Sequence, residues 1–439
     1  MSHAGSLPAA LRAENVTYPH GAGRTAGMGL FVVGAIGLGV LVAAGAAGVG
    51  GLSLKHALGV YHIGTMAVLA MCLGSLFFVM AFHLINAGWS ATIRRQFENV
   101  ASFLPFAYLL ILPTLAIEIA THGKLFLWLD PAYYADHSLQ AKSAYFYLPS
   151  KIVDEAGQPL TSPVFPLFFV IRAGIYGVVW TYLSRTLAKL SRTQDETGGT
   201  EASAKARFTS SWGMLLFALT TAFAAFDWLM SLDFKFFSTM WGVYYFAGSA
   251  FSASALVAVI LSRIRGGGRL QGAVTSEHFH DLGKLMFSFV VFWAYIAFSQ
   301  YFLIWYSNIP EETAFFHYRS DEGSPWRSLG IFLMIGHFGA PFLILLFRGV
   351  KKSNVLLGLM GLWALLAHVL DLYWVVRPMV YAANPSPPPV TQGMWLDVVG
   401  IVGVLAVFAG YLCWKIPSVS LVPLRDPYMH EAMEHRNYV

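Results

Sequence analysis

Long apolar stretches alternate with short polar segments along most of this chain. A helix that crosses a membrane needs roughly 20 mostly apolar residues, and about ten stretches meet that requirement. They lie at about 27–50, 57–87, 98–120, 163–187, 210–231, 237–262, 282–307, 326–347, 354–377 and 393–414. The pattern therefore predicts an all-α integral membrane protein with about ten transmembrane helices.

The polar segments divide the chain into three parts. We expect residues 1–26 to form an N-terminal segment, residues 27–414 a transmembrane domain and residues 415–439 a C-terminal tail. The longest connection, 121–162, is rich in Tyr, Asp and Lys and is expected to form a folded cap or a docking surface. Glycines are dense in the first apolar stretch, which permits close contact with another helix.

Basic residues are concentrated on one side of the predicted membrane domain. Both termini and alternate connections hold 18 of the 28 lysines and arginines, the remaining connections hold 8, and Arg172 and Lys284 lie within predicted helices. Cytoplasmic loops of membrane proteins carry an excess of Lys and Arg. Both termini are therefore expected in the cytoplasm.

Composition agrees with a membrane protein and argues against cofactors bound by this chain. Hydrophobic residues make up 56% of the sequence and charged residues 12%, whereas soluble domains carry about 25% charged residues. No Cys-x-x-Cys motif is present to hold c-type haem or an iron–sulfur cluster. A haem-b site of the cytochrome b type needs histidines from two helices at matched depths. His62 and His83 lie on one predicted helix, about 31 Å apart along its axis, and no second helix has a pair of histidines that matches them. We therefore expect no metal site, and no basic run is long enough to indicate nucleic acid.

Several ionisable residues fall inside the apolar stretches, where each costs about 2.5–3.5 kcal/mol on insertion scales. His368 and Asp371 share one helix face because they are three residues apart. Buried ion pairs or side chains that extend to the interface would explain any single residue. The set near the outer side is His62, Glu118, Arg172, Asp227, His337, His368, Asp371 and Asp397, and the set near the cytoplasmic side is His83, His280, Asp281 and Lys284.

Two groups of ionisable residues at opposite depths indicate the ends of a proton pathway. The predicted pathway residues are Asp227, His280, Asp281, Lys284, His337, His368 and Asp371. Asp371 is the preferred relay, and water or hydroxyl groups such as those of Ser288, Ser299 and Tyr295 are expected to bridge the two groups. A quinone pocket is a further expectation, near His62, Arg172 and Asp227.

Two blocks of sequence carry a resemblance to a known family. Residues 226–249 read FDWLMSLDFKFFSTMWGVYYFAGS, and residues 280–312 read HDLGKLMFSFVVFWAYIAFSQYFLIWYSNIPEE. Both resemble the F subunits of bacterial alternative complex III, which belong to the wider NrfD/polysulfide-reductase family of quinol-interacting membrane proteins. The resemblance extends from the second to the tenth apolar stretch and includes Asp227, His280, Asp281 and Lys284.

The resemblance implies two four-helix bundles plus two further helices in a bacterial inner membrane. It implies a subunit that supports the oxidation of menaquinol or ubiquinol and electron transfer to cytochrome c or a similar acceptor. The implied partners are a paralogous NrfD-like membrane protein, c-type cytochrome subunits, an iron–sulfur subunit, lipids and a terminal oxidase. Haem c and iron–sulfur clusters would then reside in the partner subunits, and quinol oxidation is assigned chiefly to the NrfD-like paralogue.

Two other classes of function fit parts of the pattern. A secondary transporter also has intramembrane charges and broken helices, but no paired discontinuous segments are visible in matching halves of the sequence. A structural anchor for peripheral subunits fits the long outer connection but leaves the buried carboxylates unexplained. Co-purification of haem proteins would distinguish a member of a redox complex from a transporter.

Overall fold

The computed structural model describes residues 8–381 and 388–437. Within these residues the regular secondary structure is all helical, apart from an isolated bridge between Val153 and Pro159. Ten helices or helix pairs are long and apolar enough to cross a membrane, so the predicted multi-pass membrane protein is confirmed. The spans are Arg24–Ala47, Leu54–Leu84, Gly88–Ala120, Leu167–Thr197, Glu201–Leu232, Trp241–Gly266, Ser276–Ser307, Arg327–Leu346, Asn354–Tyr381 and Met394–Ser418.

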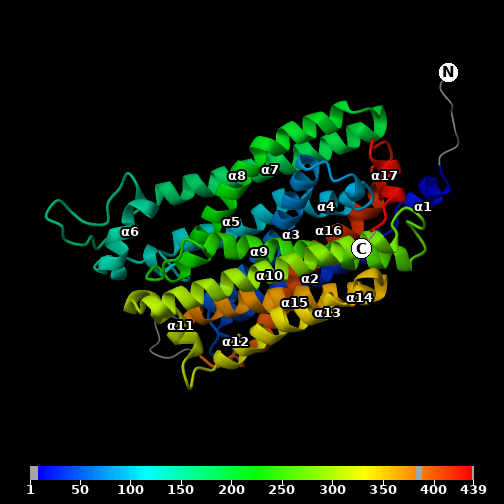
Figure 1. The fold of residues 1–439 in the computed structure, drawn as a ribbon. Helices are drawn as coiled ribbons and strands as arrows, with labels where there is room; N and C mark the ends of the chain where they lie inside the picture. The colour runs from blue at the N-terminus through cyan, green and yellow to red at the C-terminus, as the bar shows by residue number, and fades with distance from the viewer. Residues whose placement is uncertain (1–7, 382–387, 438–439) are drawn as a thin grey trace.

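The spans form two groups of four and one pair (Figure 1). The first group packs around α3 (Leu54–Leu84) and the second around α9 (Trp241–Gly266), and these two helices join the groups. The first group also contains α4 (Ala91–Ala101), α5 (Leu104–Ala120), α7 (Leu167–Thr197) and α8 (Glu201–Trp228). The second also contains α10 (Ser276–Ser307), α12 (Arg327–Leu333), α13 (Ala340–Leu346) and α15 (Asn354–Val376).

The first and last spans form the remaining pair, α2 (Arg24–Ala47) and α16 (Met394–Lys415), which also packs on α3. Glycines make the close approach possible, as the dense glycines of the first span predicted. A Cβ on Gly37 would lie 3.1 Å from the Cα of Gly403, and one on Gly34 would clash with Val407. Helices without side chains at the contact can bring their backbones together.

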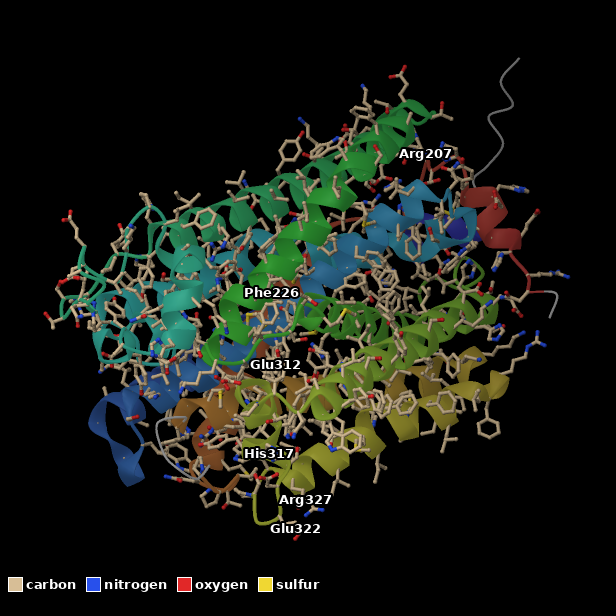
Figure 2. All side chains as sticks on the ribbon, turned by 60° about the vertical axis from the view of Figure 1, so that its left-hand side comes forward. Arg207, Phe226, Glu312, His317, Glu322 and Arg327 are labelled. Atoms are coloured by element: carbon tan, nitrogen blue, oxygen red, sulfur yellow. The ribbon has the colours of Figure 1, made fainter. Side chains whose placement is uncertain are left out.

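The two ends of the bundle differ in charge and in what covers them. We call the end with α1 (Ala13–Val16), α14 (Arg348–Lys352) and α17 (Met429–Glu434) the basic end (Figure 1). Arg207 lies toward this end, while Glu322 and Arg327 lie far from it (Figure 2). The C-terminal tail is held there by the buried ion pair between Arg94 and Asp426. The backbone N–H of Leu424 in the tail also donates to Asp195 on α7, which is paired with Arg95.

The opposite end, the cap end, is covered by the predicted folded connection, which contains α6 (His137–Tyr147). Trp128 and Phe146 stack with ring centroids 4.1 Å apart, and both are buried. One carboxylate oxygen of Glu118 accepts the backbone N–H groups of Lys124, Leu125 and Phe126. A buried carboxylate that accepts several N–H groups fixes the loop around it, so Glu118 anchors the cap to α5.

Helix ends differ from the sequence expectation mainly at the basic end. The fourth span extends to Thr197, and the fifth begins at Glu201. Both positions lie well beyond the apolar stretches, because charged residues continue the two helices into the aqueous region. Helix α2 begins at Arg24, inside the segment that we expected to precede the membrane domain. The eighth span is interrupted by a π-helix, Met334–Gly339, just before Pro341.

Candidate functional site

A buried carboxyl group lies at the centre of the second four-helix group. Asp371, on α15, is 2% exposed. It accepts hydrogen bonds from the hydroxyl of Tyr244 on α9 and, at 3.2 Å, from the indole N–H of Trp293 on α10. Three helices therefore meet at one carboxyl group, which lies toward the cap end of the membrane domain.

Two histidines lie beside this carboxyl group, and we call the five residues Tyr244, Trp293, His337, His368 and Asp371 the Asp371 cluster. The rings of His337 and His368 are 6.3 Å apart, and Trp293 packs on His337 with centroids 4.0 Å apart. Both imidazoles are buried, and none of their four ring nitrogens has a hydrogen-bond partner among the described residues. Because buried polar atoms are nearly always bonded, these nitrogens are available to a proton, water or ligand.

Local backbone features make room for the two histidines. Gly248 lies against His368, where a Cβ would come within 2.8 Å of the imidazole Cε1. His337 is carried by the π-helix at Met334–Gly339, and such single-turn π segments in α-helices are frequent at functional sites. The structure thus brings together three predicted pathway residues, His337, His368 and Asp371.

Asp227, the fourth predicted residue near the cap end, belongs to a different site. Arg172 binds its carboxylate with two nitrogens, at 3.0 and 2.7 Å, and Tyr176 donates a hydrogen bond of 2.6 Å. The guanidinium also lies 3.9 Å from the centroid of the Tyr145 ring. His62 bonds the carbonyl oxygen of Trp228 at 2.7 Å. This site lies in the first four-helix group, so Asp227 has no bond to the Asp371 cluster.

The predicted residues at the basic end are bonded to the C-terminal tail. His435 binds the carboxylate of Asp281 at 2.6 Å, and Lys284 bonds both Asp281 and, at 2.9 Å, Asn437. His280 lies nearby, with its Nδ1 4.0 Å from a carboxylate oxygen of Glu277. His280, Asp281 and Lys284 therefore form one surface cluster that the tail covers.

Two of the three hydroxyl groups that we expected between the two groups of ionisable residues face outward and cannot bridge them. Tyr295 is 64% exposed on the outer face of α10, where it cannot join two interior sites. Ser288 is also exposed and donates its hydroxyl to the carbonyl oxygen of Lys284 at 2.9 Å. Ser299 is only partly buried. The period of α10 turns its hydroxyls outward while Trp293 faces the interior.

Sequence reasoning did not identify a second buried network, around Asp397 at the start of α16. Its carboxylate binds His56 and the hydroxyl of Tyr373, each at 2.6 Å, and Arg377 at 3.2 Å. Tyr373 and Arg377 are four residues apart on α15 and its extension, a spacing that places them on one helix face. The spacing of Tyr373 and Arg377 is visible in the sequence, but nothing there connects these two residues with Asp397.

Arg319, on α11 (Pro310–Ser320), was also not identified. It is fully buried outside the membrane spans and donates to the carbonyl oxygens of Phe315, Trp374 and Val375. Burial lowers the pKa of Arg319 to about 9, which still leaves a cation at neutral pH. It thus bonds the last carbonyls of α15, where the helix dipole favours positive charge.

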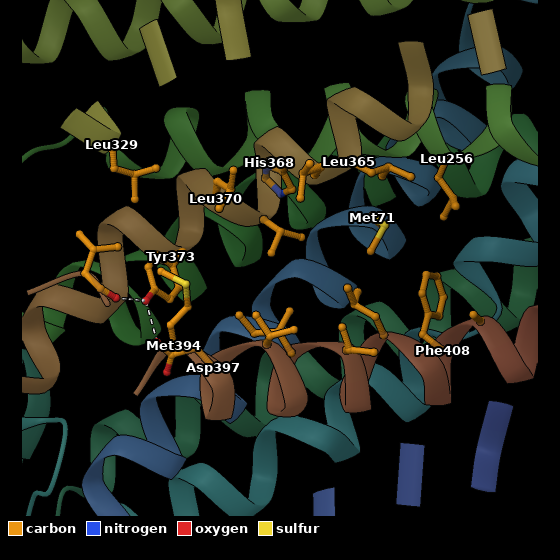
Figure 3. Close-up of a pocket in the computed structure, with 18 of the residues that line it drawn as sticks. Met71, Leu256, Leu329, Leu365, His368, Leu370, Tyr373, Met394, Asp397 and Phe408 are labelled. Carbon is orange, nitrogen blue, oxygen red and sulfur yellow. Dashed lines mark hydrogen bonds between the residues drawn. The ribbon is translucent and has the colours of Figure 1, made fainter. Parts of the chain in front are cut away.

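An apolar cavity of about 620 Å³ lies between α15 and α16 (Figure 3). Three of its lining residues carry polar side chains, namely His368, Tyr373 and Asp397. The remaining lining residues are Met71, Leu256, Leu329, Leu365, Leu366, Val369, Leu370, Val390, Met394, Val398, Ile401, Val402, Leu405, Phe408, Ala409 and Leu412. We call this cavity the α15–α16 groove.

No protein-family model matches the chain, and no curated protein matches it. The geometry of the Asp371 cluster and the two sequence blocks are therefore the features that indicate function. No group of three or more metal-ligating side chains occurs in the part of the chain that the structure describes.

Proposed function

We propose that this chain is a membrane subunit of a quinol-oxidising complex of the alternative complex III type and contributes part of a proton pathway. The main support for the proposal is that the two sequence blocks that resemble this family meet in the fold. Tyr244 and Gly248 come from block 226–249, Trp293 comes from block 280–312, and all three contact His368 or Asp371. The residues that carry the resemblance thus surround the buried carboxyl group.

The chemistry of the cluster is proton exchange. Asp371 can hold a proton at its carboxyl group, and Tyr244 and Trp293 orient that group by donating to both of its oxygens. His368 lies one turn away and has free ring nitrogens, among the described residues, that can accept or release a proton. A titratable group inside a membrane is expected to be functional and to lie on an ion or proton route.

The proposal extends to the cellular setting. The chain would lie in a bacterial inner membrane with the basic end in the cytoplasm, because 18 of its lysines and arginines lie on that side. Its partners would be the NrfD-like paralogue, c-type cytochromes and an iron–sulfur subunit, and the last two would hold the redox cofactors. Residues of this chain would then handle protons while electrons move through the partners.

The test combines purification with a proton measurement. In mild detergent the chain should co-purify with haem c and iron–sulfur subunits. In vesicles containing the assembled complex, Asp371→Asn should lower quinol turnover or the ratio of protons moved to electrons transferred. Haem content serves as the control for assembly. Isolation of an active, haem-free homo-oligomer would instead support a transporter.

A second candidate, a membrane anchor without proton conduction, is favoured by the closed ion pairs. Arg172 and Asp227 satisfy one another, and Asp281 is bonded to the tail. In the anchor these groups hold helices together and the folded cap docks a peripheral subunit. Normal turnover and a normal proton-to-electron ratio in both Asp371→Asn and Asp227→Asn would favour the anchor.

A further inference from the structure

Basic side chains gather where α14 packs on α10 at the basic end of the bundle (Figure 1). Lys284 comes from α10, and Arg348, Lys351 and Lys352 come from α14. The charges of Lys284, Arg348 and Lys351 all act on the buried imidazole of His280, so the three cations lie close together. Like charges at short range repel one another, and negative groups are therefore needed to balance them. We call this region the α10–α14 junction.

Two carboxylates lie at the α10–α14 junction, and both are already paired. Glu277 binds Lys352, while Asp281 binds both Lys284 and His435 of the C-terminal tail. These bonds hold the tail and α14 to the start of α10. Each carboxylate is thus committed to a cation of its own and leaves the other cations of the junction unbalanced.

Arg348 and Lys351 are the unbalanced cations. Within the part of the chain that the structure describes, the ion pairs of the junction include neither of them. Lys351 lies across Gly283, where a Cβ would come within 2.6 Å of the lysine Cγ, and its ammonium is 5.8 Å from the centroid of the Phe287 ring. Burial and the charge of Lys284 lower the pKa of Lys351. An anion bound beside Lys351 would offset both effects, because negative charge favours the protonated amine.

An apolar wall continues from the unbalanced cations into the membrane. Arg348 is the first charged residue after the eighth span, a position that places it at the membrane interface. The rings of Phe287 on α10 and Phe342 on α13 stack with centroids 5.4 Å apart. Beside them, Leu343 and Phe347 are 59% and 67% exposed. A ligand with an anionic head and an apolar tail therefore matches both parts of the surface.

We propose that the α10–α14 junction binds the phosphate of an anionic phospholipid. The guanidinium of Arg348 and the ammonium of Lys351 bind the phosphate oxygens, for which arginine has a matching fork of donors. The acyl chains lie against Phe287 and Phe342. Basic pockets between transmembrane helices are known to take such head groups. A zwitterionic head group carries an ammonium of its own and gains less from two cations. The inference is independent of the proposed function, since it requires only that the spans cross a membrane.

The test is photolabelling of the full chain in phosphatidylcholine vesicles that contain a small fraction of phosphatidylglycerol with a diazirine in one acyl chain. The label should be found on peptides of α10 or α13, and unlabelled phosphatidylglycerol should displace it. Arg348→Gln combined with Lys351→Gln should lower this labelling at least five-fold. The matched control is Arg185→Gln combined with Lys189→Gln, which removes an arginine and a lysine from exposed positions of α7 in the other four-helix group.

The double variant should fold, because neither side chain belongs to an ion pair among the described residues, and thermal unfolding checks this. If it does not fold, Arg348→Gln alone serves, since Arg348 is exposed, and it should lower labelling at least two-fold. Labelling that persists in the folded variants would overturn the inference. Equal labelling of the same peptides by a diazirine phosphatidylcholine would also overturn it, because the head group would then not be selected.

Two further results would replace the lipid with another anion. Displacement of the label by inorganic phosphate would show that the junction takes a free anion. Labelling that occurs in the isolated chain but is lost in an assembled complex would show that an acidic segment of a partner protein covers the cations. Photolabelling measures binding without turnover, so its outcome is independent of the proton-to-electron ratio in Asp371→Asn.

Discussion

Tyr244 and Asp371, which are 127 residues apart in the sequence, share a hydrogen bond inside the second four-helix group. The bond joins α9 to α15 at the depth where His368 and His337 are also buried. The tyrosine hydroxyl donates to an oxygen of Asp371, and such a bond is stronger to an ionised carboxylate than to a protonated carboxyl group. The protonation state of Asp371 and the strength of the bond from Tyr244 are therefore linked.

Tyr244→Phe should change the proton chemistry of Asp371 without removing the carboxyl group. Loss of a hydrogen bond to a charged group costs about 1.5–3 kcal/mol, so the carboxylate form should become less stable. The measurement is infrared difference spectroscopy of the complex, in which the carboxyl band should shift in Tyr244→Phe and vanish in Asp371→Asn. A band that is unchanged in Tyr244→Phe would contradict the link, and intact haem content is the control.

The Arg172–Asp227 pair should be important for stability. Removing one partner of a buried ion pair leaves an uncompensated charge and costs about 3–5 kcal/mol. Arg172→Ala should therefore lower the free energy of unfolding by this amount in a detergent-unfolding experiment, whereas Arg172→Met combined with Asp227→Leu should recover much of it. Lys235→Ala is the matched control, because its pair with Asp136 is exposed and should contribute less than about 1 kcal/mol.

Arg319 should stabilise the C-terminal end of α15. Arg319→Ala leaves the carbonyl oxygens of Trp374 and Val375 without this donor, and each buried unsatisfied group costs about 1–3 kcal/mol. Hydrogen exchange at the end of α15 should accelerate, and the protein should unfold at a lower temperature. Arg319→Lys keeps a cation and should lose less stability. Equal losses in both variants would show that guanidinium geometry, and not the charge, is essential.

The sidedness of the membrane can be tested with single cysteines. In a background with Cys72→Ala and Cys413→Ala, Glu155→Cys lies in the exposed cap connection and Glu201→Cys lies at the exposed turn of the basic end. In intact cells, a membrane-impermeant maleimide should label the first cysteine only, and it should label the second after lysis. The reverse pattern would place the basic end outside and would overturn the proposed topology.

The number of spans could be predicted from the sequence because apolar length alone decides which segments can cross a membrane. Glycine density indicated that the first span could make a close helix contact, but it did not indicate that the partner is α16. The partners of the buried charges could not be predicted in the same way. Asp371 was identified because a carboxyl group in an apolar stretch is unusual, but Tyr244 and Trp293 look like ordinary aromatic residues until packing places them beside it. Likewise, the outward direction of Tyr295 depends on how α10 is rotated, which its sequence does not reveal.

The pairing of Arg94 with Asp426 has a consequence for biogenesis. The two residues are 332 positions apart, so Arg94 leaves the ribosome well before its partner. All ten spans precede Asp426 in the chain, and the helices are therefore synthesised before the basic end can close. A truncated chain that stops before residue 426 would contain every span yet leave the Arg94 side chain without this partner. The face around Arg94 therefore stays open until Asp426 has been made, and a protease that cleaves this open face would act on chains that lack the tail.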